Sequence, residues 1–225
     1  MDDGKLEAGR TVNGDVSLGA RYCIQWSQWQ LIDSILPTGG FAHSYGLEAA
    51  VQTRVALSID EVRSFIIHVL ENTGSLLLPF VCAATVSPNM ETWKKLNSIL
   101  DATLNNEVSR KASATQGSAL MRVAATVFKE APIFGLTCGL LGIDSETAQR
   151  AYLFMTTRDV ISAATRLNLM GPLGAAVLQH EIASTAEEVL RKWMDRPVED
   201  ACQTSPVLDT LQGCHSYLFS RMFCS

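Results

Sequence analysis

Two short stretches of this 225-residue chain concentrate the residue types that could do chemistry or bind a partner. The first runs from Leu36 to Glu48 and contains a proline, three glycines, a histidine and a serine. The second is the C-terminal stretch from His215 to Ser225, which contains a tyrosine, two phenylalanines and one arginine. Histidine, serine and glutamate can build a nucleophile with its base, whereas aromatic residues and arginine are enriched at protein interfaces. Catalysis and partner binding are therefore the two classes of function to weigh.

The neighbours His43 and Ser44 do not predict a catalytic pair. Adjacent side chains diverge by about 100° on a helix, so His43 could not orient Ser44 within one segment. We expect Ser44 to cap the helix that follows it, and Glu48 to complement the positive end of that helix. We predict no catalytic residue in this stretch.

The run from Pro37 to Gly40 predicts a tight turn, because proline fixes one φ angle and glycine reaches positive φ. We assign the turn to Pro37, Gly39, Gly40 and Gly46. Aromatic and hydrogen-bonding side chains follow at once, from Phe41 to Tyr45, close to a backbone that could approach another chain. The alternative is a turn whose aromatic residues enter the protein's own core, and the local sequence leaves both open.

The C-terminal stretch surrounds Arg221 with Tyr217, Phe219 and Phe223. These types favour an interface, and arginine can donate a planar fork of hydrogen bonds to a partner. The alternative is a terminal strap that packs on the core of the same chain. Composition alone does not separate these two interpretations either.

The sequence contains no strong pattern for a metal, a cofactor or a nucleotide. The four histidines are not spaced four residues apart from one another, and the six cysteines include no Cys-x2-Cys pair. None of the fifteen glycines lies in a phosphate-binding loop. Gly135 and Gly139 are better explained by close helix packing. We therefore predict no bound cofactor and no dedicated metal site.

Composition narrows the range of partners. The net charge is −5 with a pI near 5.4, and no run of Lys or Arg exists, so we expect neither nucleic acid nor a membrane surface as a partner. Charged residues make up 18% of the chain against a usual share of about 25%, which favours burial in an oligomer or complex. The N-terminus lacks the pattern of a signal peptide, so we expect a cytoplasmic protein with reduced thiols.

Helical signals dominate the chain, and we predict an all-α single-domain bundle of about nine helices. Ser58 and Glu61 form a capping box, which predicts a helix start at 58 or 59. Asp144 is a second predicted cap. Further predicted helices span about 24–34, 76–86 with a possible interruption before it at Gly74, 90–100, 106–129, 132–141, 144–168 and 172–193.

Three regions follow from these signals. Residues 1–21 offer too little apolar surface to fold and are predicted to be a disordered arm. Residues 22–195 form the helical domain. Residues 196–225 are a C-terminal linker and partner-binding tail, in which 196–213 is expected to be irregular because of its two prolines and scattered polar residues.

The first stretch resembles the hallmark of one family, the urease accessory protein UreF family. Its pattern Leu-Pro-x-Gly-x-aromatic-x-x-Ser-x-Gly-Leu-Glu is met by Leu36, Pro37, Gly39, Phe41, Ser44, Gly46, Leu47 and Glu48. The ending typical of the family is met by His215, Ser220, Arg221, Phe223 and Ser225, with Met222 in place of Leu and Phe219 in place of Tyr. The resemblance spans about residues 26–225. Phe41 and Phe219 stand where relatives can carry Tyr, so a phenolic hydrogen bond to Arg221 does not transfer.

This resemblance implies a non-catalytic, all-α homodimer that helps to mature urease, the nickel enzyme that hydrolyses urea. The family joins the scaffold protein UreD (UreH) and the GTPase UreG on apo-urease and supports GTP-dependent nickel delivery. By analogy, the residues that form or brace the partner-binding region are Phe41, His43, Ser44, Glu48, Tyr217, Phe219, Ser220, Arg221 and Phe223.

Two alternatives stay open at this stage. One is a helical-bundle enzyme that holds a metal or cofactor through His43 and Glu48 with His68 or His180. The other is a metallochaperone that binds nickel directly through a different set, Cys214, His215 and Cys224.

Overall fold

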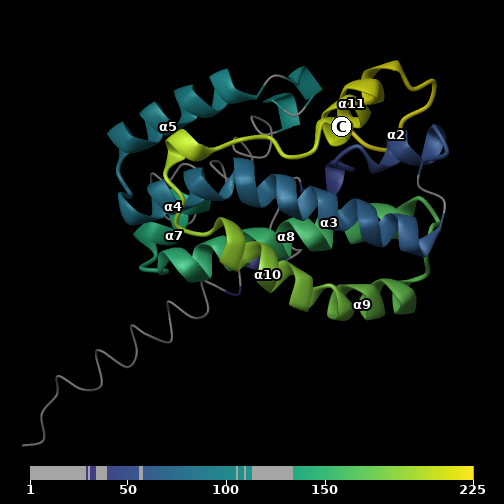
Figure 1. Cartoon of the computed structure of the whole chain (residues 1–225), viewed down its shortest axis with the longest axis horizontal. Helices are drawn as coiled ribbons and strands as arrows, with labels where there is room; N and C mark the ends of the chain where they lie inside the picture. The colour runs from purple at the N-terminus through teal and green to yellow at the C-terminus, as the bar shows by residue number, and fades with distance from the viewer. Residues whose placement is uncertain are drawn as a thin grey trace, which may run out of the picture.

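The computed structural model describes residues 29, 31–33, 40–55, 58–104, 106–108, 110–112 and 134–224. All the regular elements in this part of the chain are helical, which confirms the predicted all-α class (Figure 1). The elements are η1 (Gly40–Ala42), α2 (Leu47–Gln52), α3 (Ile59–Leu76), α4 (Leu78–Val86), α5 (Met90–Thr103), α7 (Phe134–Leu140), α8 (Ser145–Arg166), α9 (Pro172–Glu181), α10 (Ala183–Trp193), η2 (Val198–Asp200), α11 (Pro206–Cys214) and η3 (His215–Tyr217).

The predicted helix caps at Ser58 and Asp144 are both present. The Ser58 hydroxyl accepts a hydrogen bond from the Glu61 amide, and the Glu61 carboxylate accepts one from the Ser58 amide. The Asp144 carboxylate accepts from the amide of Thr147 at 2.8 Å. These bonds satisfy amide groups that the first turn of a helix leaves without partners, so α3 and α8 begin where the sequence predicted.

The main core forms where α3 packs against α8 and α10. Figure 1 shows α3 running through the middle of the molecule, with α9 and α10 along one long edge and α5 along the other. Buried side chains from these helices include Leu70 and Ile66 of α3, Leu153 of α8 and Leu190 of α10. A smaller apolar cluster joins α4 to α7.

Gly74 does not interrupt the path of α3, contrary to our expectation. The helix continues to Leu76, and the change of direction occurs at Leu77. A Cβ atom at position 74 would lie 2.6 Å from Cδ1 of Trp193, so this glycine lets α10 approach α3 closely. Gly135 and Gly139 act in the same way between α7 and α4, which confirms the packing role predicted for them.

The predicted helix over residues 172–193 is two helices. The chain changes direction at Ile182, a residue with a 1% exposed side chain between α9 and α10. No proline or glycine marks this point in the sequence. Ile182 packs into the main core at this point. The sequence pattern did not predict the break, because it depends on this contact with other helices.

The region over residues 196–213, expected to be irregular, contains η2 and the regular helix α11. Pro206 occupies the first turn of α11, where its missing N–H group costs nothing. Leu208 and Leu211 bury one face of this short helix. Sequence reasoning took the prolines as signs of a linker, whereas one of them begins a helix.

Several predictions lie outside the described residues. They are the arm over residues 1–21, most of the helices predicted over 24–34 and 106–129, and the turn residues Pro37 and Gly39. Among the described helices, none is by itself long and apolar enough to cross a bilayer; α3 and α4 reach that length and composition only as a pair bent by 43°.

Candidate functional site at the C-terminal tail

The two stretches that the sequence singled out lie against each other. We call residues 40–48 the motif segment and residues 215–224 the tail. The amide of Cys224 donates a hydrogen bond to the carbonyl of Ala42 at 2.7 Å, and Gln52 of α2 donates to the carbonyl of Ser220 at 2.9 Å. Helix α11, which leads into the tail, packs against α2 (Figure 1). Tertiary structure therefore joins the two stretches in one site.

Glu48 is the centre of this contact. Its Oε1 atom accepts a hydrogen bond from the Met222 amide at 2.6 Å, and its Oε2 atom accepts one from the Phe223 amide at 3.2 Å. The same Oε2 atom lies 3.0 Å from Nε2 of His215. Only 2% of Glu48 is exposed. Glu48 lies in the first turn of α2 as predicted, but its main contacts are with the tail.

The site contains two buried histidines, and His215 is the one in contact with the Glu48 carboxylate. His215 is 2% exposed and His43 is 4% exposed. Burial lowers the pKa of His43 below its ordinary value of 6.5, and the positive charge of a protonated His215 lowers this pKa further. Both effects favour the neutral form of His43 in the folded protein.

Two arginines of α8 hold the aromatic residues of the site. The guanidinium of Arg158 lies 4.9 Å from the ring centre of Phe41, and that of Arg166 lies 4.3 Å from the ring centre of Phe223. Arg166 also donates to the carbonyl of Phe41 at 2.5 Å. Sequence reasoning missed both arginines, because nothing in the pattern of α8 shows which of its faces meets the ends of the chain.

Arg158 also pairs with its neighbour Asp159 at 2.8 Å. Burial raises the pKa of the Asp159 carboxyl, and the charge and hydrogen bond of Arg158 oppose this rise. The guanidinium of Arg158 further donates to the carbonyl of Ile32 at 2.6 Å. One arginine thus connects α8 to two segments near the start of the chain.

The outer face of the tail carries large apolar groups in water. Tyr217 is 90% exposed, Phe219 is 105% exposed and Met222 is 53% exposed. Ser220 and Arg221 are exposed between them, and no described residue forms a hydrogen bond or ion pair with the Arg221 guanidinium. A cluster of exposed aromatic side chains around an arginine is the composition of an interface core.

The structure separates the predicted site residues into two groups. His43, Ser44, Glu48 and Phe223 are buried, and Phe41 is half-buried. Tyr217, Phe219, Ser220 and Arg221 are exposed. Buried residues can brace the site, whereas only the exposed ones can touch a partner without rearrangement.

Ser44 is not the cap of α2, contrary to our expectation. The cap position belongs to Gly46, whose φ of 89° lies in the left-handed region that favours glycine. Ser44 contributes its backbone carbonyl, which accepts a hydrogen bond from the Leu47 amide at 3.0 Å. Gly40, which we assigned to the turn, begins the short helix η1.

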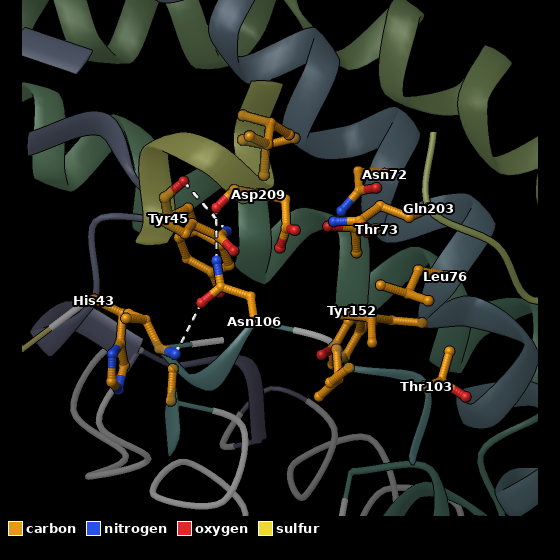
Figure 2. A pocket seen from close by; sticks show the side chains of 17 residues that line it. His43, Tyr45, Asn72, Thr73, Leu76, Thr103, Asn106, Tyr152, Gln203 and Asp209 are labelled. Atoms are coloured by element: carbon orange, nitrogen blue, oxygen red, sulfur yellow. Dashed lines mark hydrogen bonds between the residues drawn. The ribbon is translucent and has the colours of Figure 1, made fainter. Parts of the chain in front are cut away.

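A pocket of about 100 Å³ lies next to the motif segment (Figure 2). Figure 2 shows His43 and Tyr45 at one side of it and Asn72, Leu76 and Gln203 at the other. Asn106 also lines the pocket, and its side-chain amide donates a hydrogen bond to the carbonyl of Asp209 at 2.6 Å. Tyr152 also lines the pocket.

The Tyr152 phenol in this wall keeps its proton at neutral pH. Burial raises its pKa to about 12, and the negative charge of Asp159 adds to the rise.

Across the described residues as a whole, no group of three or more His, Cys, Asp or Glu side chains is placed to hold a metal ion.

Fold and site define an all-helical protein whose two signature segments form one joint surface. A family model described as UreF matches residues 58–183. "Urease accessory protein F" of Arabidopsis thaliana is 63% identical, over 92% of this chain and 95% of its own length. The protein of the same name from Oryza sativa subsp. indica is 64% identical over 89% of this chain and 85% of its own length. The chain belongs to the UreF family.

A more distant relative shows how far this similarity reaches. The "Uncharacterized urease accessory protein UreF-like" of Schizosaccharomyces pombe is 25% identical, over 87% of this chain and 94% of its own length. The family identified from the residues 36–48 and 215–225 is therefore confirmed by comparison of nearly the whole chain.

Proposed function

We propose that this protein is a urease accessory protein that acts as a non-catalytic adaptor. It joins UreD (UreH) and the GTPase UreG on apo-urease and so supports GTP-dependent nickel insertion. Nickel is the cargo of this assembly. Membership of the UreF family and the names of the plant relatives support the role in urease maturation.

The exposed tail is the observation that carries this proposal. Tyr217, Phe219 and Arg221 are presented to solvent, while the opposite side of the tail is anchored on Glu48 and Phe223 is buried. Exposed aromatic groups and an arginine on an ordered backbone suit an interface, because little conformational freedom is left to lose on binding. We assign this face to UreD.

Further parts of the proposal concern the assembly. The chain forms a homodimer, which then presents a composite surface to UreG. The low share of charged residues, 18% of the chain, agrees with surface that becomes buried in a complex. The protein works in the cytoplasm, with neither nucleic acid nor a membrane as a partner.

Replacement of Arg221 by alanine tests the proposed contact. The side chain is exposed and pairs with no described residue, so Arg221→Ala should leave the melting temperature within about 1–2 °C while abolishing urease activation. Activation is measured in a reconstituted mixture of apo-urease, UreD, UreG, nickel, bicarbonate and GTP. Complexes are weighed by light scattering in the same mixtures.

The matched control is Arg191→Ala, because Arg191 is also exposed and, among the described residues, its guanidinium bonds only to a carbonyl of its own helix. The control variant should activate urease fully. Full activation by Arg221→Ala would refute the assignment of the tail face. Stoichiometric metal on the lone chain, or turnover without partners, would replace the adaptor by a metallochaperone or an enzyme.

A further inference from the structure

Glu48 is chemically unusual among the residues of the site, because a buried carboxylate is costly unless its charge is compensated. Here the compensation comes from the tail. With Nε2 of His215 protonated, the two carboxylate oxygens accept three hydrogen bonds, from His215 and from the amides of Met222 and Phe223. No described lysine or arginine pairs with Glu48.

The pattern of these bonds gives Glu48 control over a particular piece of backbone. Met222 and Phe223 are consecutive, and each of their amides points at a different oxygen of the same carboxylate. Their side chains then fall on opposite sides, since Met222 is 53% exposed and Phe223 is 5% exposed. The carboxylate therefore determines which side of the tail faces the solvent.

We infer that Glu48 is a positioning residue for the tail: its buried carboxylate fixes the backbone at 222–223 and so holds Tyr217, Phe219 and Arg221 outward. The other contacts of the tail leave the amides of Met222 and Phe223 to Glu48. The guanidinium of Arg166 lies over the Phe223 ring, 4.3 Å from its centre. Gln52 contacts the carbonyl of Ser220 at an exposed position, and Cys224 bonds to Ala42 at the last described residue. The ordering of the tail does not depend on a partner; its use in binding UreD rests on the proposed function.

Glu48→Gln is the sharpest test, because it keeps the size of the side chain and replaces one oxygen by an NH₂ group. Either orientation of the amide places that NH₂ group against a backbone N–H, at Met222 or at Phe223, so one hydrogen bond becomes a contact between two donors. The tail should then detach while the core helices stay folded.

Hydrogen–deuterium exchange of the free, full-length protein measures this effect locally. In Glu48→Gln, a peptide covering residues 218–224 should exchange about ten-fold or more faster, because a bond to a charged group is lost. Peptides from α3 and α8 should exchange as in the wild type. Gln52→Ala, which removes the neighbouring exposed contact to Ser220, is the matched control and should change the tail peptide much less.

Unchanged exchange of the tail in a folded Glu48→Gln protein would overturn the inference. If this variant fails to fold, Glu48→Asp replaces it, because Asp keeps the charge and withdraws the oxygens by one carbon–carbon bond. Loss of protection confined to the tail supports the inference, whereas equal loss across α3 and α8 overturns it. These measurements use no partner, so they stand apart from the outcome of Arg221→Ala in urease activation.

Discussion

At the scale of single residues, His43 shows how the site treats charge. It lies in the motif segment, is 4% exposed, and has a pKa lowered by burial and by His215. A group whose pKa is lower in the folded than in the unfolded chain binds fewer protons when folded. The free energy of unfolding therefore decreases as the pH falls below the unfolded value of about 6.5, and it stops decreasing below the folded pKa.

His43→Gln should remove this part of the pH dependence. We expect the wild type to lose up to about 1.4 kcal/mol more stability than the variant for each pH unit between 6.5 and the folded pKa of His43. Urea unfolding of both proteins at pH 7.5 and pH 5.5 measures the difference. His68→Gln is the control, because His68 is an exposed histidine on α3. Equal pH dependence of wild type and His43→Gln would contradict the interpretation.

At the scale of secondary-structure elements, the position of α10 against α3 depends on a missing side chain. Gly74 lies inside α3, where glycine is usually about 1 kcal/mol less favourable than alanine. Its benefit is the close approach of Trp193, whose indole Nε1–H also donates to Glu71 at 2.6 Å. The local preference of the helix and the packing of two helices thus oppose each other at this residue.

Gly74→Ala should destabilise the protein in spite of the better helix propensity of alanine. The added methyl group would meet Trp193 at 2.6 Å, and overpacking of this kind costs about 1–3 kcal/mol. Gly174→Ala in α9 is the matched control, because its new Cβ would meet nothing closer than 3.8 Å. The control should be neutral or slightly stabilising. Urea unfolding compares the two, and equal stability of both variants would show that Trp193 moves aside without cost.

At the scale of the whole molecule, the motif segment and the tail meet on the same side of the helical core. The motif segment and the tail are separated by more than 150 residues in sequence and bond to each other through Glu48 and Ala42, and Gln52 of α2 adds a bond to the tail. Two arginines of α8 contact both segments: Arg158 lies over the ring of Phe41, and Arg166 lies over the ring of Phe223. The tail is thus held on the helical core, while its residues Tyr217 and Phe219 stay exposed.

The substitution Phe219→Ser tests the stability of the fold and the binding of a partner separately. Because Phe219 is 105% exposed, the substitution should change the free energy of unfolding by no more than about 0.5 kcal/mol. Under the proposed function, binding to UreD should weaken at least ten-fold if the aromatic ring is an anchor of the interface. Calorimetric titration with UreD and thermal unfolding measure the two effects. Phe154→Ser on α8, also an exposed phenylalanine, is the control and should leave binding unchanged.

The sequence by itself determined the helical class, the caps at Ser58 and Asp144, and the two stretches whose pattern resembles the family. These features are local, because a cap or a motif is complete within a few residues. The bend at Ile182, the helix from Pro206 and the packing of Gly74 were decided by contacts between elements. Only the tertiary structure could show that Glu48, assigned by the sequence to a helix dipole, holds the tail, because its three partners lie at least 167 positions away.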